Sequence, residues 1–353
     1  MDCYWLSHGI SIEKRYINDC CLLRDTNFNG SPFVMDLDEN NLVDWDKLFA
    51  LKRVLRNLKK TEEKSCKGCR ALEDDFNFDN DESYISFINF NHWNRCNSKC
   101  IYCSSIYNGG DRYFNVLPLI KSLIEYKDGK YIRGTGEFTF QGGEPTLLPE
   151  FEELLDLLMV YIDKHKMRIH SSGIKYSKSI EKGLKENLLQ IIVSPDSAIK
   201  ETYEKIKRVE AYDLVWENLL KYATVQKTPD NVRVKFIIIP GINDTIEEVD
   251  AFLDKIQEIN VHYIVLDIEG RCCAEHNYDI PQAAMLLDYI THQANKRNIE
   301  FELYDGAIYV NKNRKHEPSV VDETFKAKYD ALREEYSCKN FDYSRPTIKY
   351  SIR

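Results

Sequence analysis

The sequence predicts an α/β fold, a partial (βα)6 TIM-like barrel with a small N-terminal cysteine-rich domain and a C-terminal extension. Strand-like and helix-like segments alternate through the middle of the chain, which is typical of a parallel sheet with crossover helices. An acidic, Asn-rich stretch at residues 73–82 precedes them and reads as a linker. The cysteines group into separate regions on either side of it. We therefore expect domains at residues 1–80, 81–305 and 306–353.

Six apolar runs of ordinary strand length form the expected barrel. They cover residues 84–90, 137–141, 167–171, 190–194, 232–239 and 262–268. The expected helices lie at residues 112–126, 150–164, 179–186, 200–225 (two helices), 246–259 and 282–296, with a further strand at 301–304. Pro149 and Thr245 lie where a first helical turn or a cap is expected.

The composition is that of an ordinary globular protein, with 43% hydrophobic and 30% charged residues in 353. The 57 acidic residues outnumber the 48 basic ones and give a net charge of -9, which disfavours a phosphate backbone as partner. Two locally basic runs, 52–64 and 200–208, carry apolar residues at helical spacing, so we interpret them as solvated helix faces. We expect no nucleic-acid partner.

The N-terminus lacks the basic and apolar regions of a secretory signal, and no segment approaches about 18 uninterrupted apolar residues. These features predict a cytoplasmic protein without a membrane span. Eleven cysteines in a reducing compartment are better read as metal ligands or reactive thiols than as disulfides.

Three cysteines, Cys96, Cys100 and Cys103, follow closely on the first predicted barrel strand. Their loop is therefore expected at the C-terminal mouth, where barrel enzymes hold their catalytic residues. Three thiolates can bind three corners of a cubane cluster and leave the fourth iron free for a small molecule. Structural zinc is the alternative, but it normally takes four protein ligands.

The CxxxCxxC spacing, with Tyr102 before the last cysteine, resembles the signature of the radical S-adenosylmethionine (radical SAM) superfamily. The resemblance implies a 4Fe-4S cluster on Cys96, Cys100 and Cys103 that reductively cleaves S-adenosylmethionine. The 5'-deoxyadenosyl radical formed in this way abstracts a hydrogen atom from a substrate carbon. Tyr102 would then belong to the cofactor site.

A second element, Gly142-Gly143-Glu144-Pro145, ends the second predicted strand and is similar to the GGEP element of the same family. The resemblance implies that it binds the amino group of the cofactor. Paired glycines allow close backbone approach, and Glu144 offers an acceptor for an ammonium group. Taken alone, the same residues are also those of an ordinary turn.

Polar residues follow the next strands as well. The segments around Ser172 and Ser194 partly resemble motifs of related enzymes, so both serines are candidate hydrogen-bond partners for the ribose or carboxylate of the cofactor, and Asp196 is a candidate for facing substrate. Isolated polar residues at strand ends are otherwise usually caps or turn formers. Asn243 and Asp244 would contribute to the barrel mouth or cap the next helix, and of these roles we expect capping.

The N-terminal cysteines form a candidate second metal site. Cys3, one of Cys20 or Cys21, Cys66 and Cys69 give four thiols for an auxiliary iron-sulfur cluster or for zinc. The arrangement resembles the SPASM or twitch extensions of radical SAM enzymes, although those follow the barrel and this one precedes it. Free, buried cysteines are the alternative.

The late cysteines Cys272, Cys273 and Cys338 are candidate hydrogen-atom donors, as in radical epimerases, although filling of the core is also consistent with Cys272 and Cys273. Asp267, Glu269 and Arg271, spaced by two, are expected to share one face at the barrel mouth.

The expected function is therefore a radical SAM enzyme, an oxidoreductase or an epimerase or isomerase, that oxidises, rearranges or epimerises a small molecule, sugar or peptide. Its expected partner is an electron donor such as flavodoxin or ferredoxin. The alternative is a non-catalytic zinc or iron-sulfur protein that organises an interaction surface.

Overall fold

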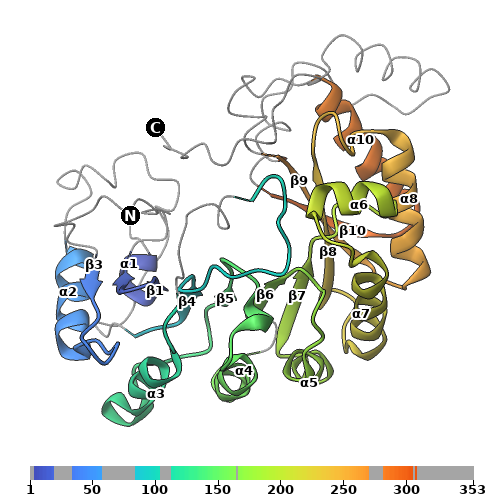
Figure 1. Ribbon diagram of the computed structural model, residues 1–353. Helices are drawn as coiled ribbons and strands as arrows, with labels where there is room; N and C mark the ends of the chain where they lie inside the picture. Colours follow the sequence, from blue (N-terminus) through green and yellow to red (C-terminus); the bar gives the residue numbers. More distant parts are fainter. Residues whose placement is uncertain are drawn as a thin grey trace. The chain divides into compact units, whose positions relative to one another are not determined.

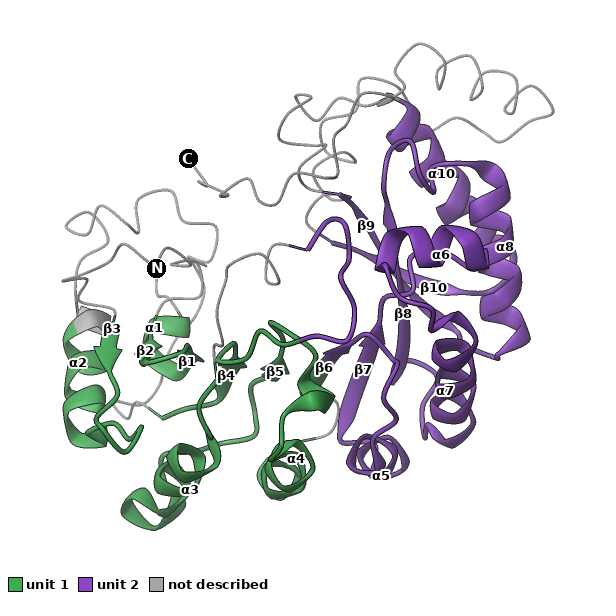
Figure 2. Cartoon of the chain, in the orientation of Figure 1, with its two compact units in different colours: residues 1–95, 110–169 green, residues 96–109, 170–353 purple. Residues whose placement is uncertain are grey.

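The computed structural model describes residues 4–19, 34–57, 84–103, 113–163, 166–269, 281–304 and 307. The chain divides into two compact units, shown in green and purple in Figure 2. Unit 1 comprises residues 1–95 and 110–169, and unit 2 comprises residues 96–109 and 170–353. The cysteine triplet therefore belongs to unit 2, and the Gly142–Pro145 element belongs to unit 1.

Unit 1 contains a mixed sheet in the order β3-β2-β1-β4-β5-β6. The pairs β1–β2 and β2–β3 are antiparallel, whereas β1–β4, β4–β5 and β5–β6 are parallel. The strands are β1 (Gly9–Ile12), β2 (Tyr16–Asn18), β3 (Val34–Asp36), β4 (Phe87–Phe90), β5 (Phe138–Phe140) and β6 (Met167–Ser171). The last two residues of β6 belong to unit 2.

The helices of unit 1 bury one apolar face each. They are α1 (Tyr4–His8), α2 (Trp45–Asn57), α3 (Leu117–Glu125) and α4 (Phe151–Met159), with 3-10 turns η3 (Tyr126–Gly129) and η4 (Pro145–Leu147). In α4, Phe151, Leu154, Leu155 and Leu158 follow helical spacing and are all buried. The ring of Phe151 packs edge-on against Phe140 of β5, with centroids 5.6 Å apart, which joins the helix to the sheet.

Unit 2 contains the parallel strands β7 (Leu189–Val193), β8 (Val232–Ile238), β9 (Tyr263–Ile268) and β10 (Glu300–Leu303), paired in that order. Its helices are α5 (Lys178–Glu186), α6 (Lys200–Lys207), α7 (Tyr212–Val225), α8 (Ile246–Glu258) and α10 (Pro281–Lys296). Phe236 of β8 contacts Phe252 of α8, with ring centroids 4.8 Å apart, on the side of the strands where α7 and α8 lie (Figure 1). Alternate residues of β8, including Arg233 and Lys235, therefore point to the opposite face.

Two helices of unit 2 begin at side-chain caps. The Ser177 hydroxyl accepts a hydrogen bond from Ile180 N at 3.1 Å and begins α5, and Thr245 accepts one from Glu248 N at 3.2 Å and begins α8. Helix α5 ends at Asn187, which adopts a left-handed conformation with φ 64°.

The predicted α/β class with a mostly parallel sheet is confirmed, and the sheet is open, with β3 and β10 as edge strands. All six predicted barrel strands are present. The helix predicted at 112–126 begins only at Leu117, immediately before Pro118, which fits a first helical turn. The predicted domain boundaries stay a prediction; β1 and β4, which lie on either side of the boundary at residue 80, pair in one sheet.

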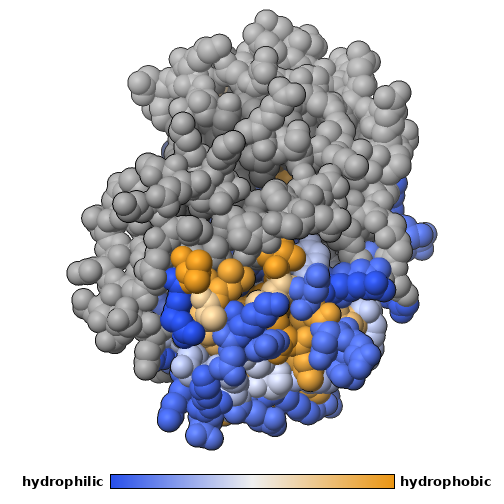
Figure 3. All heavy atoms as spheres, turned by 90° about the vertical axis from the view of Figure 1, so that its left-hand side faces the viewer, coloured by the Kyte–Doolittle hydropathy of each residue, from blue (hydrophilic) through white to orange (hydrophobic). Residues whose placement is uncertain are grey.

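The described surface is mixed in character. Figure 3 shows hydrophobic residues among hydrophilic ones on one face of the described chain. The exposed large apolar side chains are scattered over different elements and define no surface by themselves: Val54, Tyr113, Val160, Leu214 and Leu220. Within the described ranges, no helix is both long and apolar enough to cross a membrane.

Candidate functional site

The cysteine loop, residues 96–103, docks onto the end of α6. Lys99 N donates to Lys207 O at 2.9 Å, and Ile101 N donates to Ile206 O at 3.0 Å. A turn within the loop is closed by the hydrogen bond from Cys103 N to Cys100 O, also at 3.0 Å. These backbone contacts hold the segment that carries all three thiols against one helix terminus.

Apolar packing supports the same loop. Ile101 is buried in a cluster with Ile206 of α6 and with Ile237 and Ile239 at the end of β8, and the Tyr102 ring and Ile242 pack against it. The loop is therefore placed at the C-terminal end of β8, as expected for a barrel mouth.

The three cysteines are all partly exposed. Ser98 N lies 3.4 Å from the Sγ of Cys96, so a backbone amide donates to a candidate ligand sulfur. Burial raises the pKa of the Cys100 thiol, and the charge of Lys207 opposes that rise. Three reachable sulfurs, one of them already accepting an amide hydrogen bond, are a donor set that fits an iron-sulfur cluster.

A single metal ion is a different case. Among the described residues, no three His, Cys, Asp or Glu side chains converge in a way that would hold one ion. In a cubane each thiolate binds a different iron, so its ligands need not meet at one point.

Tyr102, expected in the cofactor site, directs its hydroxyl into a buried charged cluster. The hydroxyl donates to Asp196 Oδ2 at 2.5 Å and accepts from Lys207 Nζ at 2.6 Å. Burial, and after it the Asp196 carboxylate, holds the pKa of Tyr102 well above its usual value, so the phenol stays protonated. Lys207 and Asp196 also form a direct ion pair in which both side chains are buried.

The two predicted serines both lie directly after strands of the sheet. Ser172 follows β6 and Ser194 follows β7, and both are partly exposed. The Ser172 hydroxyl donates to Asn97 Oδ1 at 2.9 Å. Ser172 is therefore tied to the residue that follows Cys96 in the cysteine loop.

The Gly142–Pro145 element of unit 1 is held by the chain that leads into Cys96. Gly143 N donates to Trp93 O at 2.8 Å, and Glu144 N donates to Arg95 O at 2.7 Å. A Cβ on Gly142, which has φ 101°, would lie 2.6 Å from Trp93 O, and one on Gly143 would lie 2.3 Å from Arg95 O. Only glycine fits this close backbone approach at both positions.

Glu144 is 1% exposed, and its carboxylate works as a cap. Its Oε1 accepts hydrogen bonds from Thr146 Oγ1 at 2.6 Å and from Thr146 N at 3.2 Å, at the start of η4. Trp93 Nε1 donates to the Glu144 carbonyl at 3.0 Å. The turn expected as an alternative is thus present, and a role for Glu144 toward an ammonium group stays a prediction.

Other predicted site residues lie outside the described part of the chain. These are the auxiliary-cluster candidates Cys3, Cys20, Cys21, Cys66 and Cys69, the hydrogen-donor candidates Cys272, Cys273 and Cys338, and Arg271.

Two expectations for the polar loops are corrected. Thr245, not Asn243, caps α8, because the Asn243 side chain is buried and bonded to the backbone of Asp196, Ile237 and Ile239. Asp196, a candidate for facing substrate, is fully buried. At the expected barrel mouth, Asp267 pairs with Lys235 across 2.8 Å, and Glu269 is buried.

The basic runs also differ from expectation, because the described part of each run contains a buried lysine. Lys52 and Lys207 are 0% and 4% exposed. Both lie at helical spacing from buried apolar residues, Leu48 and Phe49 for Lys52 and Tyr203 for Lys207. That position on the apolar helix face was the signal in the sequence that could have identified them.

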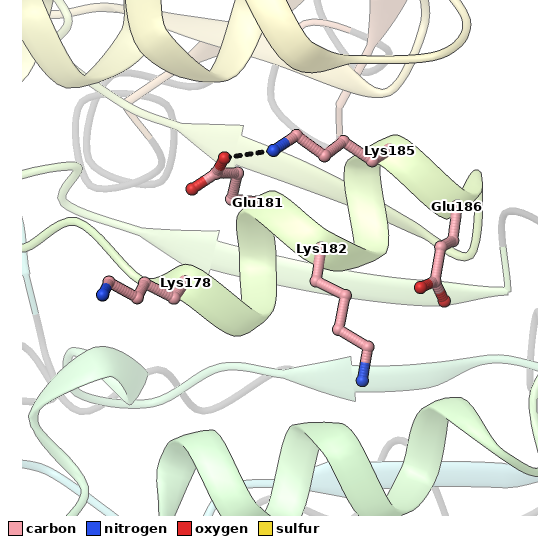
Figure 4. Close-up of a pocket in the computed structure, with 5 residues that line it drawn as sticks. All are labelled: Lys178, Glu181, Lys182, Lys185 and Glu186. Carbon is pink, nitrogen blue, oxygen red and sulfur yellow. Dashed lines mark hydrogen bonds and ion pairs between the residues drawn. The ribbon is translucent and has the colours of Figure 1, made fainter.

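A surface hollow on α5 carries no sign of this chemistry. One helix supplies all of its lining, and Figure 4 shows an ion pair between Glu181 and Lys185 along that helix. Its residues are Lys178, Glu181, Lys182, Lys185 and Glu186. Charged side chains of this kind are typical of a solvated helix face.

Comparison with known proteins decides the family. The radical SAM superfamily matches residues 90–256, which include the cysteine loop, the Gly142–Pro145 element and strands β5 to β8. Residues 90–256 are therefore a radical SAM domain. Members of this superfamily are enzymes that use a 4Fe-4S cluster and S-adenosylmethionine, so the non-catalytic alternative is not supported.

Curated relatives of this radical SAM chain include GTP 3',8-cyclases. That of Clostridium botulinum (strain Okra / Type B1) is 24% identical over 205 residues, which are 55% of this chain and 61% of the relative. That of Thermodesulfovibrio yellowstonii is 26% identical over 198 residues, 55% of this chain and 58% of the relative. The chain thus spans about six-tenths of the length of these relatives.

Solved structures of Streptococcus suis SuiB share the fold. SuiB bound to the precursor peptide SuiA has a TM-score of 0.50 at 16% identity and covers 86% of this chain and 73% of SuiB. SuiB bound to S-adenosylmethionine has the same TM-score at 18% identity, with 77% and 67% covered. These similarities support the open, partial-barrel fold of the radical SAM chain.

Proposed function

We propose that this chain is a radical SAM enzyme in which Cys96, Cys100 and Cys103 hold the 4Fe-4S cluster. The observation that carries the proposal is the cysteine loop, which presents three partly exposed cysteines from one segment anchored to α6. When bound, the cluster and S-adenosylmethionine supply the 5'-deoxyadenosyl radical that abstracts a hydrogen atom from a substrate carbon. The chain's own residues bind and orient these groups.

Each remaining predicted residue has a role that its placement supports. Gly142 and Gly143 allow their segment to pack directly on the chain that leads into Cys96, because a Cβ at either position would meet the carbonyl of Trp93 or Arg95. Ser172 and Ser194, at the C-terminal ends of β6 and β7, offer hydroxyl groups for the ribose or carboxylate of the cofactor. Asn97 accepts a hydrogen bond from Ser172 and would hold the Ser172 hydroxyl in place next to the cysteine loop.

For the substrate we propose a small molecule, sugar or peptide without a polyphosphate group. Lys235 lies on the face of β8 away from α8 and is already paired with Asp267 at 2.8 Å. A cation that is paired in this way has less charge to offer a phosphate. We therefore do not propose the named activity of the cyclase relatives for this chain, and the binding of a precursor peptide by SuiB, which shares the fold, is consistent with a peptide substrate.

The cofactor assignment is tested by anaerobic reconstitution with iron and sulfide, followed by dithionite and S-adenosylmethionine. We expect the wild type to release 5'-deoxyadenosine and the Cys96→Ala/Cys100→Ala/Cys103→Ala variant to release none. The variant should lose about four irons, since each cubane holds four. Lys182→Ala, on the exposed side of α5, is the control and should match the wild type. A wild type that is fully loaded with iron yet forms no 5'-deoxyadenosine would contradict the proposal.

The same reconstitution tests the second metal site. If the N-terminal cysteines hold an auxiliary cluster, the wild type should contain about eight irons and the triple variant about four. An iron content of about four in the wild type and none in the variant would exclude an auxiliary cubane.

The substrate class is tested with GTP. Binding of a true substrate next to the cofactor should raise the rate of 5'-deoxyadenosine formation above the rate without substrate. We expect GTP to leave that rate unchanged, and a GTP-dependent increase would favour the cyclase reaction. An electron donor such as flavodoxin or ferredoxin, added in place of dithionite, should support the same turnover.

A further inference from the structure

Three side chains form a buried charged cluster behind the cysteine loop. Lys207 Nζ pairs with the Asp196 carboxylate and donates to the Tyr102 hydroxyl at 2.6 Å, and that hydroxyl donates to Asp196 at 2.5 Å. The Lys207 and Asp196 side chains are 5% and 0% exposed. Each polar group of the cluster is therefore bonded to the other two.

The backbone around the cluster fixes its position. Asp196 adopts a left-handed conformation with φ 60°; its Oδ1 accepts from Ile237 N at 3.0 Å, and its carbonyl accepts from Asn243 Nδ2 at 2.7 Å. Lys207 ends α6, and its carbonyl accepts from Lys99 N of the cysteine loop. The pair thus connects the ends of β7, β8 and α6 to the loop that carries the thiols.

A buried ion pair contributes little net free energy to holding a loop in place. Desolvation of both charges offsets much of their attraction, and an apolar replacement of similar volume is often as stable. The surroundings here are apolar, with Ile101, Ile206 and Ile237 packed together. Stability alone therefore does not explain why charges occupy this position.

The pair also lies beside the cysteines. Lys207 Nζ donates at 2.6 Å to the hydroxyl of Tyr102, which stands directly before Cys103 and two residues after Cys100. The Lys207 carbonyl accepts from Lys99 N, directly before Cys100, so both charges are held next to the segment that carries two candidate cluster ligands. Charges and hydrogen bonds around an iron-sulfur cluster are among the factors that set its reduction potential.

We propose that Lys207 and Asp196, joined through Tyr102, are positioning residues that set the reduction potential of the cluster held by Cys96, Cys100 and Cys103. The inference rests on the proposed function. A positive charge near the cluster favours the reduced, more negative state, and a negative charge disfavours it. The balanced pair holds the potential between the two values that either charge alone would give.

The test is an EPR-monitored redox titration of reconstituted protein. Lys207→Met leaves the carboxylate unpaired and should lower the midpoint potential. Asp196→Asn leaves the ammonium unpaired and should raise it. The double variant should return close to the wild type. Lys205→Met removes a charge from the exposed side of the same helix and should leave the potential unchanged.

The opposite signs separate this role from a purely structural one. A structural role would lower iron content in both single variants without moving their potentials apart, and shifts of the same sign or no shift would overturn the inference. Should Lys207→Met not retain a cluster, Asp196→Asn alone decides, because only a rise supports the inference, and Lys207→Arg should then keep the wild-type potential. A wild type that binds no cluster would instead refute the proposed function.

Discussion

Among the described residues, two lysine-aspartate pairs are buried, one in each unit, and their surroundings differ. In unit 1, Lys52 of α2 lies 2.9 Å from Asp19 and donates to the carbonyl of Gly9 at 2.6 Å. In unit 2, Lys207 pairs with Asp196 and with the Tyr102 hydroxyl. The first lysine binds a carboxylate and backbone carbonyls, whereas the second binds side chains next to a cysteine.

The difference separates a structural role from a functional one. Lys52 joins α2 to β1 and β2 at the start of the sheet, and its three acceptors satisfy the whole ammonium group, since Leu6 O lies 3.4 Å away. The pair of Lys207 and Asp196 instead lies beside the cysteine loop, where we propose that its charges set the reduction potential of the cluster. Removal of either lysine leaves a buried carboxylate, but the consequences should appear in different measurements.

The largest expected effect on stability is that of Lys52→Met. The substitution leaves Asp19 buried and unpaired, which typically costs about 3–5 kcal/mol. We expect a large fall in the urea midpoint, with no change in the reduction potential of a cluster in unit 2. Lys47→Met, on the exposed side of the same helix, should leave the midpoint nearly unchanged. An equal effect of both substitutions would remove the distinction between the two pairs.

His92 differs from both buried ion pairs because it is buried without a polar partner. Neither of its ring nitrogens has a hydrogen-bond partner among the described residues. Burial lowers its pKa from 6.5 to about 4, so the folded state favours neutral imidazole. The resulting stability is present above pH 6.5 and is lost as the pH falls toward 4. Between about pH 7 and pH 5 the loss should be about 2 kcal/mol.

The measurement is the free energy of unfolding at both pH values. His92→Phe should remove this part of the pH dependence, while His262→Phe, at an exposed position, should keep it. A wild-type slope that survives in His92→Phe would show that other groups cause it.

The smallest expected effect is that of Tyr102→Phe. This substitution removes the hydroxyl group that bonds to both Lys207 and Asp196. The ion pair of Lys207 and Asp196 remains, so the cost should be about 1 kcal/mol, typical of a lost hydrogen bond. Because Tyr102 lies between Cys100 and Cys103 in the cysteine loop, we expect faster loss of iron to a chelator. Tyr161→Phe, in unit 1, is the control, and equal rates in both variants would show that the hydroxyl does not hold the loop.

Local sequence patterns predicted the elements closely. Strand β6 has the bounds expected from its apolar run, and α8 begins after Thr245, where a cap was expected. Both features depend on residues that are close together in the sequence. The cysteine spacing and the paired glycines likewise indicated the family, because cluster ligands and close-approach glycines occur at short, regular spacing.

Burial of Lys52, Lys207 and Asp196 was not predicted. A lysine on a helix reads as solvated unless its partner is known, and Asp19 lies 33 residues before Lys52 in the sequence. Asn243 was expected to cap a helix because it precedes one, yet its side chain bonds to the backbone of Asp196, 47 residues away. Contacts of this length are set by how the strands are placed beside one another.

The sequence alone determined the order of strands and helices, the cysteine triplet and the cofactor chemistry it implies, since each is written in short-range spacing. Only the tertiary structure showed that the cysteine loop docks onto α6 and that Lys207 and Asp196 lie behind it. The physical reason is that a charge is buried only where the fold supplies its partner. Where the partner comes from a distant strand end, no local pattern records it.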